Sequence, residues 1–134
     1  MPARLRHFAI VVRDLERSAR FYQNVFGFRE VGREDLEIGS GIYLSDGYIN
    51  LALLQYKSSA GSGLADPKGF VGAHHFGIQV DDLAQTQQRI EAAGGEFYFD
   101  LGNDANKYNF ERKFKDPDGV IFDISKNGWL NASD

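Results

Sequence analysis

Two histidines occupy equivalent positions in a sequence that repeats itself. His7 begins the segment His-Phe-Ala-Ile-Val-Val-Arg-Asp-Leu, and His75, at 75 − 7 = 68 residues further on, begins His-Phe-Gly-Ile-Gln-Val-Asp-Asp-Leu. Neutral imidazole is the commonest nitrogen ligand of first-row metals. A lone strand histidine is more simply explained by a backbone hydrogen bond, but a pair related by a repeat predicts a divalent metal site.

A carboxylate completes the candidate ligand set. Asp123 lies in the apolar segment Val-Ile-Phe-Asp-Ile-Ser, directly after the turn sequence Asp-Pro-Asp-Gly at 116–119. Burying an unpaired carboxylate in such a strand is costly, so a metal or an Arg/Lys partner must compensate for it. We therefore predict that His7, His75 and Asp123 bind a metal, and a salt bridge or hydrogen bond to Asp123 is the alternative.

The elements that must position these residues also occur twice, in the same order. The β-branched segments at 4–12 and 73–80 are each followed by an aspartate that can cap a helix, Asp14 in the first copy and Asp81 or Asp82 in the second. The helices are expected to end at Gly27 and near Ala93, and further strands are expected at 28–36, 40–45, 48–56, 96–101, 108–115 and 120–126. The order β-α-β-β-β, repeated, predicts an α+β fold.

The repeat also predicts how the chain is organised. We expect a single domain with module 1 at about 4–56, a Ser/Gly-rich linker or lid at 57–70, module 2 at about 71–126 and a C-terminal tail at 127–134. One such four-stranded unit has an open edge and a poorly covered face, so two units should join into a partly closed, eight-stranded, barrel-like sheet around a shared pocket. Trp129 in the tail is expected to pack against the body or a partner chain.

Composition excludes several classes of function. The net charge of −4 argues against non-specific nucleic-acid binding, and no basic run suits a membrane surface. The absence of Cys excludes disulfides, thiolate zinc sites and cysteine nucleophiles. No segment resembles a signal peptide or a transmembrane span, so we expect a cytoplasmic protein.

Other side chains are candidates for the pocket. Strand alternation places Glu111 and Lys113 on one face, where they could serve as catalytic groups, although Lys113 would more often be solvated on an outer face. Alternation also directs His74 away from the face of His75. The candidate substrate-binding residues are Asn50, Tyr98, Tyr108 and Phe110.

These motifs resemble the glyoxalase/bleomycin-resistance/extradiol-dioxygenase superfamily, also called vicinal oxygen chelate, over about residues 4–126. The resemblance is carried by the His7 and His75 repeats, by Ser-Ala-Arg-Phe-Tyr-Gln-Asn-Val-Phe-Gly-Phe and by Asp-Pro-Asp-Gly-Val-Ile-Phe-Asp. It implies paired βαβββ modules and a divalent metal that chelates two neighbouring substrate oxygens. It also implies a homodimer, whose site would form within one chain or across two swapped chains.

The resemblance assigns the family's metal-ligand positions to residues of this chain, and two of these positions hold a different residue type. His7 and His75 match the two histidines of the family, whereas Asp123 stands where the family usually has the longer Glu. Isomerases and epimerases carry Glu or Gln at the position of Asn50 or Ala52. Extradiol members use two His and one carboxylate, but carry Tyr where this chain has Lys113.

The resemblance leaves several functions open. The favoured one is a metal-dependent lyase, isomerase or ring-cleaving dioxygenase for a small oxygen-rich substrate, with Fe, Mn, Ni, Co or Zn as the metal and Glu111 or a metal-bound water as the base. The alternatives are a metal-free small-molecule sequestering module of the bleomycin-resistance type and an accessory domain with a degraded site. Sequestering members generally lack the histidine pair, which favours the enzyme.

Overall fold

A computed structural model describes residues 3–100 and 111–129, and its elements follow the predicted order. The first copy contains β1 (Arg4–Val11), α1 (Leu15–Phe26), β2 (Arg29–Asp35), β3 (Gly39–Ser45) and β4 (Asn50–Tyr56). The second copy contains β5 (Gly72–Gln79), α2 (Leu83–Ala92), β6 (Glu96–Asp100), β7 (Glu111–Lys115) and β8 (Ile121–Ser125). None of the described helices is long and apolar enough to span a membrane.

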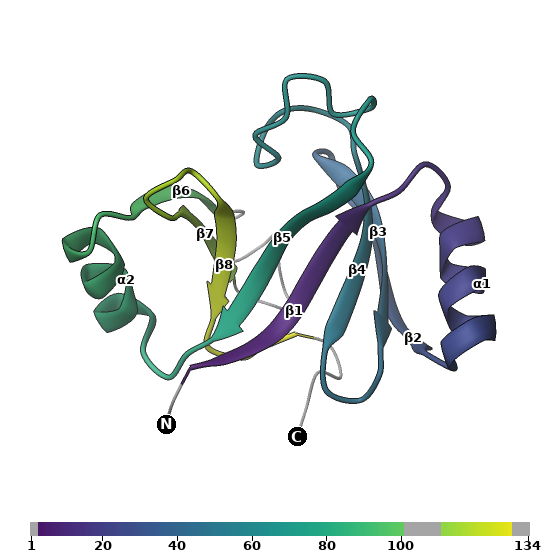
Figure 1. Ribbon diagram of the computed structural model, residues 1–134, viewed down its shortest axis with the longest axis horizontal. Helices are drawn as coiled ribbons and strands as arrows, with labels where there is room; N and C mark the ends of the chain where they lie inside the picture. The colour runs from purple at the N-terminus through teal and green to yellow at the C-terminus, as the bar shows by residue number, and fades with distance from the viewer. Residues whose placement is uncertain (1–2, 101–110, 130–134) are drawn as a thin grey trace.

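The strands form one mixed sheet of eight in the order β2-β3-β4-β1-β5-β8-β7-β6. The first strands of the two copies, β1 and β5, pair antiparallel at the centre, and each also pairs in parallel with the last strand of its own copy, β4 or β8. The sheet curves without closing, and the helices lie at its two ends (Figure 1). The predicted α+β class and partly closed eight-stranded sheet are confirmed.

The helix boundaries follow from local chemistry. Asp14 accepts a hydrogen bond from the Arg17 backbone N–H at 3.0 Å, and Gly27 ends α1 with a left-handed φ of 75°. Asp82, one of the two predicted candidates, caps α2 by accepting a hydrogen bond from the Gln85 backbone N–H at 2.9 Å.

Each helix covers the outer face of its own half of the sheet. Ala19 of α1 is buried against Ile42, Leu44 and Leu53 of β3 and β4. Val80, Phe114 and Ile124 form the corresponding core of the second half, with Leu83 and Ile90 of α2 packed against it. These two cores leave the inner, concave face of the sheet free to hold a site.

Strand β4 starts later than the expected 48–56 because the preceding turn is longer. The Asp46 carboxylate accepts hydrogen bonds from the backbone N–H groups of Tyr48 at 2.8 Å and Ile49 at 2.7 Å. These bonds hold both residues in the turn, so the ladder begins at Asn50. The predicted strand at 108–115 is described only from Glu111, because 101–110 lie outside the described residues.

Candidate metal centre

Five adjacent strands carry one row of residues across the middle of the sheet. Neighbours in this row are Asn50 on β4, His7 on β1, Gly77 on β5, Asp123 on β8 and Lys113 on β7. Paired positions in a sheet point to the same face, so all four side chains of the row meet on the concave face. The row brings together residues that are far apart in the sequence.

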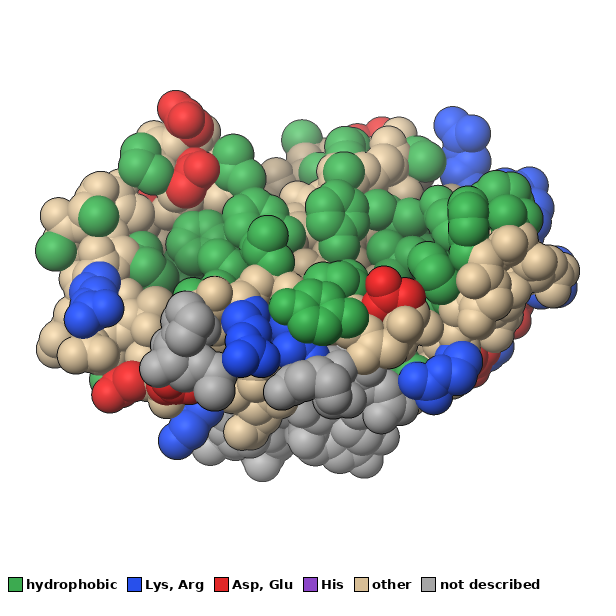
Figure 2. Space-filling model, turned by 60° about the horizontal axis from the view of Figure 1, so that its bottom comes forward, with side chains coloured by type: hydrophobic (Ala, Val, Ile, Leu, Met, Phe, Trp, Pro, Cys, Tyr) green, Lys and Arg blue, Asp and Glu red, His purple; other side chains and the backbone are tan. Residues whose placement is uncertain are grey.

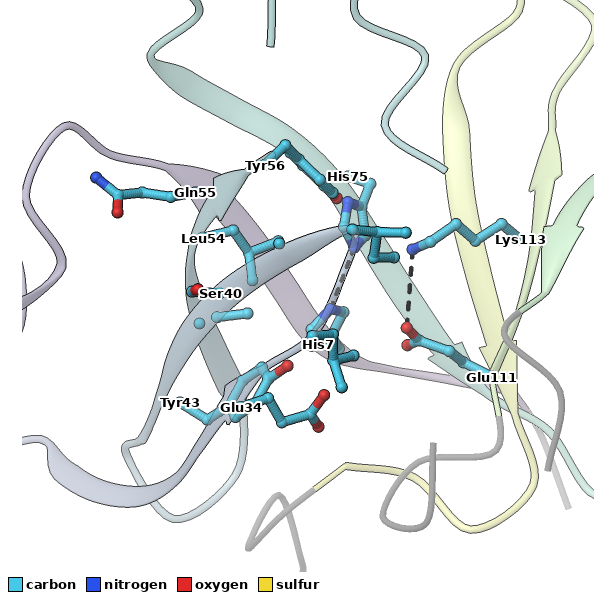
Figure 3. A pocket seen from close by; sticks show the side chains of 15 residues that line it. His7, Glu34, Ser40, Tyr43, Leu54, Gln55, Tyr56, His75, Glu111 and Lys113 are labelled. Atoms are coloured by element: carbon cyan, nitrogen blue, oxygen red, sulfur yellow. Dashed lines mark hydrogen bonds and ion pairs between the residues drawn. The ribbon is translucent and has the colours of Figure 1, made fainter. Parts of the chain in front are cut away.

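His75 joins this row from β5, two residues before Gly77 and therefore on the same face. Its Nε2 lies 3.4 Å from His7 Nε2 and 3.1 Å from Asp123 Oδ2, and His7 Nε2 lies 3.8 Å from the same oxygen. All three residues are buried. Figure 3 shows the two imidazoles directed toward each other.

Hydrogen bonds behind the two imidazoles determine which nitrogen carries the proton. Asn50 Oδ1 can only accept, so His7 Nδ1 donates to it at 2.8 Å. His74 Nε2 donates to the Ser62 carbonyl at 2.7 Å, which leaves its Nδ1 to accept from His75 Nδ1, also at 2.7 Å. Both candidate ligand histidines therefore present an unprotonated Nε2.

The three converging atoms fit a metal ion. The Asp123 Oδ2 atom is buried and has no hydrogen-bond donor among the residues that the structure describes. Two imidazole lone pairs and a carboxylate oxygen facing one another repel unless a cation lies between them. Bonds of about 2.0–2.2 Å place adjacent ligand atoms about 3.0–3.5 Å apart, which is close to the observed separations.

Burial and charge keep the histidines neutral. Burial lowers the pKa of His7, although the carboxylates of Glu111 and Asp123 oppose the effect. The pKa of His75 lies well below its ordinary value because of burial and the positive charge of Lys113. Neutral imidazole is the form that binds a metal.

Lys113 is buried on the concave face and is not solvated on an outer one, so that sequence-based expectation was wrong. Its ammonium lies 2.9 Å from Asp123 Oδ1 and 3.7 Å from Glu111 Oε1. Burial alone would lower the pKa of Lys113, but the two carboxylates outweigh it and raise the pKa above its ordinary value. Asp123 therefore has a cation at one oxygen, whereas its other oxygen faces the histidines.

Trp129 closes the site from the C-terminal side. Its ring stacks on His7 with centroids 4.8 Å apart and planes 9° apart, and its Nε1 donates to Glu111 Oε2 at 2.9 Å. Gly77 makes this possible, because a Cβ there would lie 2.6 Å from the Trp129 ring and 2.9 Å from His7 Cβ. The tail residue predicted to pack against the body thus packs on a candidate ligand.

The histidines and Lys113 border a cavity on the concave side of the sheet. Figure 3 shows His7, His75, Lys113 and Glu111 around it. Burial of the Tyr56 hydroxyl in its wall raises the pKa of that group to about 12, so the phenol stays protonated at neutral pH. The remaining lining residues are mostly apolar: Glu34, Leu36, Ile38, Gly39, Ser40, Gly41, Tyr43, Ala52, Leu54 and Gln55.

The other residues that were predicted to bind substrate do not all lie at the cavity. Asn50 is buried behind His7 and does not line the cavity, and Tyr98 lies under the Lys115 ammonium, 4.3 Å from its ring centroid. Tyr108 and Phe110 lie outside the described residues. His74 contacts His75 instead of facing away from it, because β1 and β5 pair with an irregularity at Ala9 and Ile10.

Sequence reasoning missed two features of the site. Trp129 was not connected with His7, and the apolar wall from β2 and β3 was not foreseen. A signal for the first existed in the repeat, where Gly77 replaces Ala9 of the first copy and so leaves room for a ring.

The chain belongs to the Glyoxalase/Bleomycin resistance protein/Dioxygenase superfamily, whose sequence pattern matches residues 4–124. An ethylmalonyl-CoA/methylmalonyl-CoA epimerase of Cereibacter sphaeroides is 33% identical over 99 residues, which cover 70% of this chain and 73% of that protein. A lactoylglutathione lyase of Neisseria meningitidis is 28% identical, with 93% of each protein covered. A probable chloroplastic lactoylglutathione lyase of Arabidopsis thaliana is 26% identical over 93% of this chain, which spans 36% of the plant protein.

Solved structures share the fold. A hypothetical protein of Bacillus halodurans superposes with a TM-score of 0.73 at 20% identity, with 93% of this chain and 94% of that chain covered. Methylmalonyl-CoA epimerase of Mycobacterium tuberculosis superposes with a TM-score of 0.70 at 18% identity, with 90% and 85% covered.

Proposed function

We propose that this protein is a divalent-metal-dependent enzyme that moves a proton next to a carbonyl group of a small, oxygen-rich substrate. The convergence of His7 Nε2, His75 Nε2 and Asp123 Oδ2 carries the proposal. The two imidazoles carry their protons on Nδ1 and the Asp123 carboxylate carries none, so all three buried atoms are acceptors. The cavity beside them can admit a ligand. Fe, Mn, Ni, Co and Zn all suit two imidazoles and one carboxylate.

The metal would act as a Lewis acid that stabilises negative charge on two neighbouring substrate oxygens. Glu111 is the candidate base, because its carboxylate lines the cavity and is held by Trp129 Nε1 and the Lys113 ammonium. The Lys113 ammonium lines the same cavity and adds a fixed positive charge that favours an oxyanion there. The apolar walls would limit the access of water to the proton being transferred.

The related lyases and epimerases support proton transfer over ring cleavage. Their names indicate thioesters of glutathione or coenzyme A as substrates, and we propose the same class here. The two-His, one-carboxylate set also suits an Fe(II) dioxygenase. Oxygen consumption with a catechol would favour that reaction instead.

A metal-free sequestering module is the second candidate, and one observation favours it. The Lys113 ammonium already compensates part of the charge of Asp123, so the pocket could hold an apolar compound without a metal. In that case ligand binding would be unaffected by a chelator.

Turnover assays test the proposed reaction. Protein reconstituted with each metal is supplied with lactoylglutathione or methylmalonyl-CoA, and substrate proton exchange with deuterated water is followed by NMR. We expect exchange that depends on metal and that falls by about 10²-fold or more in Glu111→Gln. An exposed-site control, Glu91→Gln, should retain it. Exchange that is unchanged by a chelator or by Glu111→Gln would overturn the proposal.

A further inference from the structure

The cavity beside the ligand triad is too small for a whole substrate. It encloses about 60 Å³, whereas pockets that bind small molecules usually enclose about 300–1,000 Å³. This volume accommodates the reacting oxygens and a few further atoms. The rest of any substrate must lie elsewhere.

A second, larger cavity adjoins the first. It encloses about 440 Å³, and the two share Ser40, Gln55 and Tyr56 as wall residues. Gln55 is held at this boundary by a hydrogen bond from its Nε2 to the Arg13 carbonyl, and Figure 3 shows its side chain directed away from His75. The outer cavity thus lies next to the reaction centre on the side away from Glu111.

The walls of the outer cavity combine apolar surface with positive charge. Its apolar side comes from the end of β1 and from the segment between the two copies, with Val11, Val12, Pro67, Phe70 and Val71. Among the described residues that line it, the charged ones are Arg13, Lys57 and Lys68, and none is acidic. This is unusual in a chain whose net charge is −4.

The three cations are not equally available. The Lys57 ammonium is already bound to Asp35 Oδ1 at 2.6 Å and to the Leu36 carbonyl at 3.0 Å. Arg13 and Lys68 are exposed, and neither takes part in an ion pair among the described residues. An anion in this cavity would therefore be bound by Arg13 and Lys68, with Lys57 adding long-range attraction.

We propose that the outer cavity binds the anionic end of an elongated substrate, a carboxylate or phosphate carried on an apolar chain. This proposal rests on the proposed function in one respect, because it takes the cavity beside His7, His75 and Asp123 as the reaction centre. The apolar walls would hold the connecting chain, while Arg13 and Lys68 would bind its anionic end. Substrate recognition would then depend on Arg13 and Lys68, which lie outside the ligand set.

The test uses metal-free protein and simple probes. Titrations of hexanoate, butyl phosphate and neutral 1-hexanol are followed by NMR at the backbone amides of 55–57 and 68–71. We expect both anions to bind at least fivefold more tightly than hexanol, and the tighter of the two identifies the carboxylate or phosphate as the preferred group. Arg13→Gln/Lys68→Gln should abolish this preference, whereas Arg20→Gln/Lys126→Gln, at exposed sites elsewhere, should not.

Equal affinity for the anions and hexanol would overturn the proposal, as would a preference that survives in Arg13→Gln/Lys68→Gln. Metal content is measured separately in the same variants and should equal that of the wild type. Anion binding in a protein that takes up no metal would leave this proposal standing while the proposed function fails, so the two failures can be distinguished.

Discussion

At the scale of single residues, the candidate site depends on neighbouring side chains that orient the proposed ligands and would not themselves bind the metal. Asn50 is the clearest of these, because its Oδ1 accepts from His7 Nδ1 and so directs the Nε2 lone pair toward His75 and Asp123. Isomerases and epimerases of the family carry Glu or Gln at the position of Asn50 or Ala52, and that longer side chain would bind the metal. Here the shorter amide serves as a hydrogen-bond acceptor.

Replacing Asn50 by Leu should therefore weaken metal binding. Loss of a comparable partner of a ligating histidine lowers affinity by about 10–100-fold, and we expect an effect in that range. Competition with a fluorescent chelator measures the dissociation constant. Asn24→Leu, at an exposed position of α1, should behave like the wild type, and an unchanged affinity in Asn50→Leu would remove Asn50 from the site.

Gly77 is the second residue that the site requires. A methyl group there meets both the Trp129 ring and His7 Cβ, so Gly77→Ala should lower the free energy of unfolding by about 1–3 kcal/mol through overpacking. Urea denaturation measures this, and the fluorescence of Trp129 should shift as its ring leaves His7. In a Trp129→Ala background, Gly77→Ala should lower the free energy of unfolding by less than it does in the wild type. An equal loss in both backgrounds would show that the two residues are not coupled.

At the scale of elements, the turn between β3 and β4 positions Asn50 and thereby His7. Asp46 accepts from the N–H groups of Tyr48 and Ile49, and the buried Arg6 donates from Nε to the Tyr48 carbonyl at 3.1 Å. The backbone hydrogen bonds from Ile49 and Tyr48 lower the pKa of Asp46 below its ordinary value.

This shift predicts how the turn responds to pH. A carboxylate whose folded pKa is lowered contributes stability above its unfolded pKa, near 3.9, and loses it as the pH falls through the lower folded value. Wild type should therefore be more stable than Asp46→Asn by about 0.5–1 kcal/mol at pH 7, and the difference should shrink below pH 3.9. Urea denaturation across this range tests it, with Asp118→Asn as the control. A difference that is constant with pH would contradict the account.

The elements were more predictable than their contacts. The repeat and the aspartate and glycine caps were enough to predict β-α-β-β-β twice, because strand alternation and capping are local properties. The pairing of β1 with β5 places His7 beside Gly77, and the pairing of β5 with β8 places Gly77 beside Asp123. This row depends on the register between strands that are far apart in the sequence. Lys113 is buried because it pairs with Asp123 on the neighbouring strand. The alternation of side chains along a single strand does not reveal such a pairing.

At the scale of the whole molecule, the outer face of the central strands is exposed. Among the described residues, α1 packs on the core of β3 and β4, and α2 packs on the core of β7 and β8. Apolar side chains of β1, which lies between these two cores, remain exposed. Leu5 and Phe8 of β1 are 59% and 42% exposed, and Figure 2 shows hydrophobic side chains gathered in a band across one face of the molecule. An apolar surface of this kind favours association with a second copy, and we propose a homodimer through it.

Charges on this face should separate the subunits. We expect sedimentation equilibrium to give a dimer for the wild type and a monomer for Leu5→Lys/Phe8→Lys, because burying two ammonium groups at an apolar interface is costly. Phe21→Lys/Val25→Lys, on the exposed side of α1, should remain dimeric. A monomeric wild type, or a dimer that persists in Leu5→Lys/Phe8→Lys, would contradict this prediction.

The most direct test of the account is metal content by elemental analysis, on protein purified without a His-tag or chelator. Wild type should contain about one equivalent of a transition metal, or take it up on reconstitution, and His7→Ala, His75→Ala and Asp123→Ala should each lose it. His74→Ala, which leaves all three ligands in place, should retain at least part of it. A wild type that binds no metal after reconstitution, or triad variants that bind as much as the wild type, would contradict the central claim.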